Sequence, residues 1–172
     1  MKDFVAQLPR LALISLLTLL SLVAYCYFFQ ANGIIPLGGK KAPNYVLILI
    51  GQVILAKLFV GKNRGSSVHF LQLFGFQYVY VLVTALLSAI TLYYFYSSPT
   101  GISWLQEYVA GSLQELVQYQ KAIVAQEGVS YYTQLKEGIR GIDAASIAKD
   151  DLSQKLALAF LPNLLISLYF KQ

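Results

Sequence analysis

Four long apolar runs, separated by polar segments, constrain the fold of this chain more than any other feature of its sequence. They cover residues 11–29, 45–60, 68–97 and 152–170. A helix that crosses a hydrocarbon core of about 30 Å needs about 20 largely apolar residues. We therefore predict an all-α integral membrane protein, a single membrane domain over residues 1–172 in which the four runs form a four-helix bundle.

The composition excludes the main alternatives to a membrane fold. Only 12% of the 172 residues are charged and 57% are hydrophobic, whereas a soluble domain carries about 25% charged residues. Disordered chains are polar and poor in aromatic residues, unlike this one. The net charge of +5 comes from Lys and Arg between the apolar runs. That pattern predicts contact with the lipid bilayer and not with nucleic acid.

Basic residues near the ends of the runs predict the orientation, because Lys and Arg are more frequent in cytoplasmic loops. With both termini in the cytoplasm, that side receives Lys2, Arg10, Lys57, Lys62, Arg64 and Lys171. The opposite side receives Lys40, Lys41, Lys149 and Lys155. We expect Lys57 and Lys155 to extend toward the headgroups. The interiors of the runs contain no Asp, Glu or Arg, so we expect a bundle without buried charge.

Residues 98–151 are too long a segment for a simple connection between two spans. Ser98 and Pro99 are turn residues that end the third run. After them, apolar residues at three- and four-residue spacing predict an extramembrane amphipathic helix that Gly128 ends. A second helical stretch over residues 130–137 follows, and Asp143 or Ser146 could cap a helix that leads into the last span.

The apolar face of this segment is a candidate partner-docking face. Its residues are Leu105, Tyr108, Val109, Leu113, Leu116, Val117, Ile123 and Val124. Helices that lie on anionic membranes usually carry many Lys and Arg on their polar face, and here Gln and Glu predominate beside Lys121. Packing over the chain's own helices, docking of a partner protein and binding to the membrane surface all remain open, and the first two fit the polar face better.

Weakly polar residues inside the runs suggest two further sites. Gln52, Gln77 and Asn163 either line a polar core or satisfy one another, and Pro162 predicts a kink beside Asn163. Thr84, Ser88 and Thr91 fall on one helical face, since they are spaced by four and three residues. Small residues at such spacing let helix backbones approach closely, so this is a candidate helix-packing face.

No pattern for catalysis, a metal or a cofactor stands out. His69 is the only His and Cys26 the only Cys, with no metal-binding motif around either. An intramembrane serine protease would need a Ser paired with a His or Lys inside the bilayer, and His69 at the edge of a run is poorly placed for that role. We predict that the protein is not an enzyme and has no cofactor.

Several positions resemble those of one protein family. Phe70, Phe74 and Gly75 open the third run, residues 93–96 close it with aromatic side chains before Pro99, and a Gln- and Glu-rich segment precedes the last run. This layout resembles a family of small four-span inner-membrane proteins of Bacteroidota, catalogued as a domain of unknown function. The resemblance implies a multi-pass protein of the bacterial cytoplasmic membrane and gives no catalytic residues.

These observations lead to two hypotheses for the function. The first is a non-enzymatic accessory or structural subunit of a larger bacterial inner-membrane complex, with other integral membrane proteins as partners. The second is a small transporter or channel for a neutral or weakly polar solute, based on Gln52, Gln77 and Asn163 with the kink at Pro162.

Overall fold

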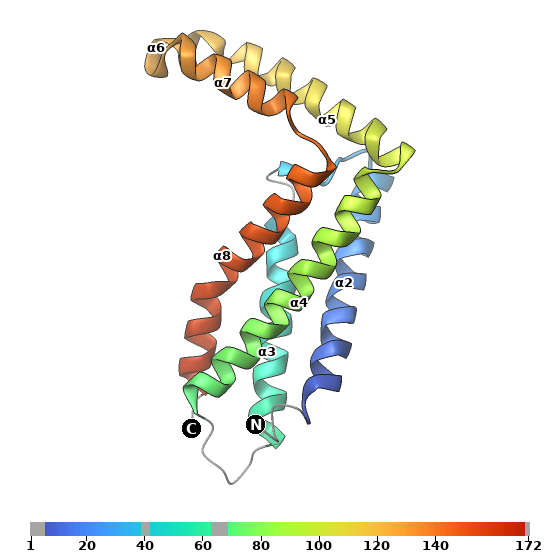
Figure 1. The fold of residues 1–172 in the computed structure, drawn as a ribbon, viewed down its shortest axis with the longest axis vertical. Helices are drawn as coiled ribbons and strands as arrows, with labels where there is room; N and C mark the ends of the chain where they lie inside the picture. The colour runs from blue at the N-terminus through green and yellow to red at the C-terminus, as the bar shows by residue number, and fades with distance from the viewer. Residues whose placement is uncertain (1–5, 39–41, 63–68, 171–172) are drawn as a thin grey trace. The chain divides into compact units, whose positions relative to one another are not determined.

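The computed structural model describes residues 6–38, 42–62 and 69–170, and these residues form helices without any strand (Figure 1). Val68 at the predicted start of the third span lies outside the described residues, as do Lys2, Lys40, Lys41, Arg64 and Lys171. The helices are α2 (Leu8–Ala31), α3 (Ala42–Lys62), α4 (Phe70–Tyr96), α5 (Pro99–Gln118), α6 (Gln120–Glu127), α7 (Val129–Arg140) and α8 (Ala144–Phe170). The predicted all-α class is confirmed.

Three of these helices, α2, α4 and α8, are long and apolar enough to cross a membrane. They contain the runs predicted at 11–29, at 152–170 and over most of 68–97. α3 coincides with the run at 45–60, but its described apolar stretch, Tyr45–Gly61, is shorter. Length and apolarity therefore fit a membrane protein.

Local chemistry explains where the helices begin and end. The Asn32 side chain donates to the carbonyl oxygen of Phe28 at 2.7 Å at the end of α2. Ser98 caps α5 by accepting from the N–H of Gly101 at 3.2 Å, as expected for an N-cap before Pro at the first helical position. Gly128 ends α6 with a φ of 88°, a left-handed conformation that favours glycine, and its predicted role is confirmed.

α8 begins earlier than predicted. Asp143 accepts from the N–H of Ser146 at 2.7 Å, and Ser146 Oγ accepts from the N–H of Asp143 at 2.9 Å. This reciprocal arrangement is a capping box, so both residues that the sequence suggested as caps take part. The helix then runs without interruption from Ala144 to Phe170, which places residue 151 two turns inside it.

The described contacts divide the chain into two compact units. We call Met1–Ala89 with Asp150–Gln172 the bundle unit and Ile90–Lys149 the hairpin unit. α4 and α8 each pass from one unit into the other. Each unit is described below by itself.

The core of the bundle unit joins α2, α3, α4 and α8. Its members include Leu11 of α2, Phe59 of α3, Phe76 and Tyr80 of α4 and Ala159 of α8. The rings of Phe59 and Phe76 lie 4.9 Å apart, within the range for favourable aromatic pairs. These contacts fix the positions of the polar groups that face the interior.

In the hairpin unit, α7 packs against both α5 and α6. The predicted amphipathic helix is interrupted at Tyr119 and so forms two helices, and the predicted second stretch continues to Arg140. Leu116 and Tyr132 are buried in this unit. The other residues of the candidate docking face are partly buried except for Val117, which is exposed. Part of that face is thus covered by the unit's own helices.

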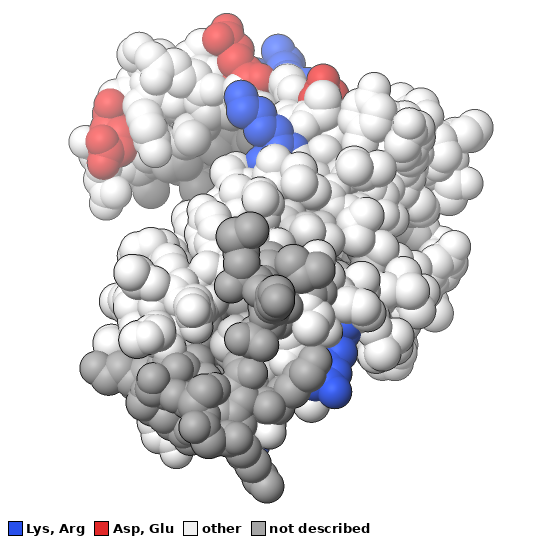
Figure 2. All heavy atoms as spheres, turned by 60° about the horizontal axis from the view of Figure 1, so that its bottom comes forward, with Lys and Arg blue, Asp and Glu red and all other residues white. Residues whose placement is uncertain are grey.

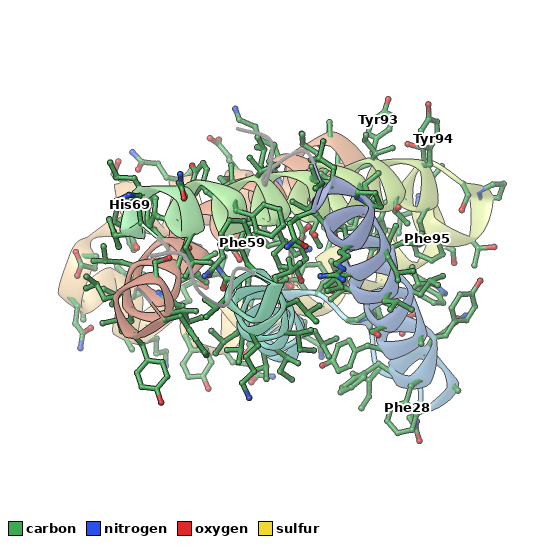
Figure 3. All side chains as sticks on the ribbon, turned by 90° about the horizontal axis from the view of Figure 1, so that it is seen from below. Phe28, Phe59, His69, Tyr93, Tyr94 and Phe95 are labelled. Atoms are coloured by element: carbon green, nitrogen blue, oxygen red, sulfur yellow. The ribbon has the colours of Figure 1, made fainter. Side chains whose placement is uncertain are left out.

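Aromatic side chains lie mostly at the ends of the long helices. Figure 3 shows Phe28, Tyr93 and Tyr94 pointing away from the helices that carry them, while Phe59 lies between helices. Exposed aromatic residues at helix ends fit interfacial belts in a membrane. Figure 2 shows few charged side chains on the described surface in its view, with the acidic ones over α5–α7.

Candidate functional site

The bundle unit buries a cluster of Ser88, Asp151 and Lys155. The Lys155 ammonium lies 2.5 Å from Oδ2 of Asp151 and donates to Ser88 Oγ, also at 2.5 Å. Ser88 Oγ donates in turn to Asp151 Oδ2 at 2.9 Å. Lys155 and Asp151 are each only 1% exposed and Ser88 is 5% exposed. Three polar side chains thus form a closed ring of hydrogen bonds away from solvent.

Two helices bring the cluster together. Asp151 and Lys155 lie one turn apart on α8, at the i and i+4 positions where side chains meet. Ser88 comes from α4, on the face that the sequence suggested for helix packing. The expected extension of Lys155 to the headgroups is wrong, as is the expectation of a bundle without buried charge. Both failed because α8 begins at Ala144 and not near residue 152.

A buried ion pair requires complete pairing to be tolerated. Removing two charges from water costs several kcal/mol per ion, and only good geometry with further hydrogen bonds offsets that cost. Here the Ser88 hydroxyl bonds to both partners. Ionisable groups inside membrane helices commonly mark functional sites, so this cluster is the first candidate in the described part of the chain.

The cluster contains a Ser beside a Lys, which raises the question of nucleophilic catalysis. Such a pair needs a neutral Lys as base and a path for substrate to the Ser hydroxyl. Lys155 is paired with a carboxylate, and the Ser88 hydroxyl donates to Asp151. Ser88 is also absent from the lining of the cavity described below. The arrangement favours charge neutralisation over catalysis.

Two of the three candidate polar-core residues belong to one hydrogen-bonded chain. Gln77 Nε2 donates to Ser167 Oγ at 3.5 Å, and Ser167 Oγ donates to Asn163 Oδ1 at 3.4 Å. Asn163 Nδ2 donates to the carbonyl oxygen of Phe74 at 3.2 Å. No described hydrogen bond links Gln52 to this chain, although Gln52 is equally buried. The chain between α4 and α8 also includes Ser167, which the sequence did not single out.

The candidate packing residues on α4 have different environments. Thr84 is fully buried and Ser88 belongs to the charged cluster, while Thr91 is partly exposed and lies in the hairpin unit. α4 also makes a polar contact with α2, because the Tyr80 hydroxyl lies 2.8 Å from Thr18 Oγ1.

α3 and α8 line a half-open cavity of about 150 Å³ in the bundle unit, and Leu158 in its wall is 55% exposed. Apolar side chains form most of its wall, including Ile48 and Leu49 from α3 and Leu158, Ala159 and Pro162 from α8. Its polar lining residues are Tyr45, Gln52 and Lys155. The cavity therefore adjoins the buried ion pair, and it is mainly apolar with few polar groups, as small-molecule sites usually are.

A further hydrogen-bonded group lies near one end of α3. The Tyr45 hydroxyl donates to Gln154 Oε1, and Gln154 Nε2 donates to Asp150 Oδ1 at 2.7 Å. Within the described ranges, no group of three or more His, Cys, Asp and Glu side chains could hold a metal ion. Amide, hydroxyl, carboxylate and ammonium groups make up the polar side of this region.

A family model described as protein of unknown function (DUF4199) matches residues 10–172. The chain belongs to the DUF4199 family. No curated protein and no solved structure matches it. The expected relation to a family catalogued as a domain of unknown function is confirmed, and the match covers α3 to α8 and all of α2 after its first two residues.

Proposed function

We propose that this DUF4199 protein is a non-enzymatic accessory subunit of a larger complex in the bacterial inner membrane. The observation that carries the proposal is a set of apolar side chains left exposed in the hairpin unit, outside the long apolar runs. They are Ile102, Val117, Tyr119, Val129 and Tyr131, each between 44% and 66% exposed. Exposed apolar and aromatic groups of this kind are typical of protein–protein contact sites.

The partner would be another integral membrane protein with an apolar extracytoplasmic surface. Lys121, Lys136 and Arg140 share the hairpin unit with Glu107, Glu115, Glu127 and Glu137. This mixed charge gives little attraction to anionic lipids, which favour a Lys- and Arg-rich face. A protein partner therefore suits the exposed apolar groups better than the membrane surface.

A tagged full-length chain, purified from its own bacterium in mild detergent, tests the proposal. We expect a stoichiometric membrane partner that is lost when Val117→Glu and Tyr131→Glu are combined. Gln114→Glu with Thr133→Glu is the matched control, because it adds the same charge at exposed polar positions on the same two helices. A monodisperse particle of this chain alone, or equal loss of the partner in both double variants, would contradict the proposal.

We also propose that α3 crosses the membrane as a fourth span and that both termini are cytoplasmic. In a Cys26→Ser background, an impermeant maleimide should label Gly33→Cys and Gln126→Cys from outside. Gln72→Cys should be protected in intact cells. If α3 did not cross, the labelling of Gln72→Cys and Gln126→Cys would be reversed.

A second candidate function is a small transporter for a neutral or weakly polar solute. The α3–α8 cavity beside Lys155 and Gln52 favours it. The buried Asp151 also supplies the intramembrane carboxylate that proton-coupled transporters commonly use. Proteoliposomes loaded with a pH-sensitive dye test this idea by measuring proton movement when a neutral solute is added. Equal signals from wild type and Asp151→Asn would exclude coupling through this carboxylate.

A further inference from the structure

The cavity between α3 and α8 contains an unsatisfied hydrogen-bond donor. Gln52 is 1% exposed, and its Nε2 has no hydrogen-bond partner among the described residues. Gln52 also lines the cavity. A buried donor without an acceptor is unfavourable, and a molecule in the cavity would recover this loss by offering an acceptor.

One residue that lines the cavity also has a backbone carbonyl without its usual helical donor. Pro162 lies inside α8 and has no N–H to donate to the carbonyl oxygen of Leu158, one turn earlier. Leu158 and Pro162 both line the cavity. The residue with the unpartnered donor on α3 and the residue with the free acceptor on α8 therefore line the same mainly apolar cavity.

The charge of the site favours a neutral occupant. Among the described residues that line the cavity, Lys155 is the only charged one, and its ammonium is already paired with Asp151. An anion would have to compete with the Asp151 carboxylate for the Lys155 ammonium. A cation would gain little attraction from an ion pair whose net charge is already zero. A molecule without net charge avoids both costs.

The depth of Gln52 distinguishes a small solute from a phospholipid. At a rise of about 1.5 Å per residue, Gln52 lies about 10 Å along α3 from Tyr45 and about 13 Å from Gly61. It is therefore near the middle of the apolar stretch, if α3 spans the bilayer as proposed. Lipid ester groups lie at the interface, about 15 Å from the centre of the hydrocarbon core, so an acyl chain alone would bring no acceptor to Gln52.

We propose that the α3–α8 cavity binds a neutral, lipid-soluble small molecule that carries one hydroxyl group on an apolar body. The hydroxyl oxygen accepts from Gln52 Nε2, and the hydroxyl hydrogen is available to the carbonyl of Leu158. A cavity of about 150 Å³ accommodates a molecule the size of benzene, so an aromatic alcohol is a suitable probe. The inference rests on the second candidate function and deepens it by naming the solute class.

The test uses the full-length protein in phosphatidylcholine nanodiscs with 4-fluorobenzyl alcohol as probe and 4-fluorotoluene as the analogue without a hydroxyl. Fluorine NMR saturation transfer, corrected with empty nanodiscs, gives the affinity of each. We expect the alcohol to bind about five- to tenfold more tightly than the toluene, as one hydrogen bond of about 1–1.4 kcal/mol predicts. Gln52→Leu should remove that difference.

Two alanines on α8 provide a matched pair of variants. Ala159 lines the cavity and is 8% exposed, whereas Ala157 is exposed and does not line it. Ala159→Ile should abolish binding of the alcohol, and Ala157→Ile should leave it unchanged. Circular dichroism and gel filtration identify a variant that fails to fold, in which case Gln52→Leu still decides the question.

Three results would overturn the inference: no binding of the alcohol, equal affinity for alcohol and toluene in the wild type, or undiminished binding in folded Ala159→Ile. Each would mean that the probe only partitions into lipid or fills apolar space. Binding without any transport of the alcohol across proteoliposomes would support the binding site and contradict the transporter, so the two proposals fail separately.

Discussion

The hydroxyl of Tyr80 on α4 lies 2.8 Å from Oγ1 of Thr18 on α2. Gly51 of α3 lies against the same tyrosine, because a Cβ atom at this position would overlap the Tyr80 hydroxyl and approach Thr18 Oγ1 to 3.3 Å. The hydrogen bond joins α4 to α2, and the lack of a side chain at Gly51 lets α3 pack against the same tyrosine, so three helices meet at this point. In membranes, small residues at helix crossings and hydrogen bonds between helices have this role.

This junction predicts that Gly51→Ala destabilises the bundle by about 1–3 kcal/mol, the usual range for overpacking a filled interior. Reversible unfolding in mixed detergent micelles measures the change. Gly75→Ala on α4 is the matched control, since a Cβ there meets nothing within 4 Å. It should be neutral or stabilising by up to about 1 kcal/mol, because alanine favours helix more than glycine. Equal effects of both substitutions would mean that the close approach at Gly51 has no energetic weight.

The ion pair of Asp151 and Lys155 predicts strong coupling between the two residues. Lys155→Met alone should destabilise the protein by about 3–5 kcal/mol, because it leaves a buried carboxylate unpaired. Combining it with Asp151→Leu should restore most of the stability, since replacing a buried pair with apolar residues is often neutral. A double-mutant cycle in the same unfolding assay checks this.

Lys57→Met is the control for the loss of one lysine, because Lys57 is exposed on α3. It should change the free energy of unfolding by less than about 0.5 kcal/mol. Additive effects of Lys155→Met and Asp151→Leu would argue against the pair as an energetic unit.

The unpartnered amide of Gln52 predicts an unusual gain of stability. In the absence of solute, Gln52→Leu should stabilise the bundle by about 1–3 kcal/mol, because it removes a buried donor without an acceptor. Gln77→Leu should stabilise less, because it removes the hydrogen bond from Gln77 Nε2 to Ser167 together with the unpartnered Gln77 Oε1. Unfolding in detergent without added solute compares the two. A loss of stability in Gln52→Leu would show that the Gln52 amide is satisfied.

The positions of the long helices were predictable because they depend on local apolar runs. The turn at Ser98, the helix end at Gly128 and the cap at Asp143 were also predictable, since each depends on neighbours within three or four residues. The Ser88–Asp151 contact was not, because it joins residues 63 positions apart on α4 and α8. One signal could have pointed to it: Asp151 and Lys155 have the i, i+4 spacing of a helical ion pair.

For the candidate sites too, contacts between different helices could not be predicted from the sequence. The sequence grouped Gln52, Gln77 and Asn163 because amides are rare in apolar runs, and periodicity along one helix says nothing about partners on another. The fold links Gln77 and Asn163 through Ser167 and places Gln52 in the α3–α8 cavity. For the docking face, the spacing marked an apolar surface without indicating that α7 would cover part of it.

The capping box at the start of α8 predicts a pH dependence. Hydrogen bonds from the backbone and side chain of Ser146 lower the pKa of Asp143 below its ordinary value, so the cap is stabilising above that ordinary value, about 3.9, and is lost as the pH falls through the lower folded-state pKa. The NMR shift of the Ser146 amide proton should therefore titrate below pH 3.9. Asp143→Asn should abolish the titration while keeping the cap, because asparagine is an equally good N-cap. An inflection at or above the ordinary carboxyl pKa, or one that persists in Asp143→Asn, would assign the titration to another group.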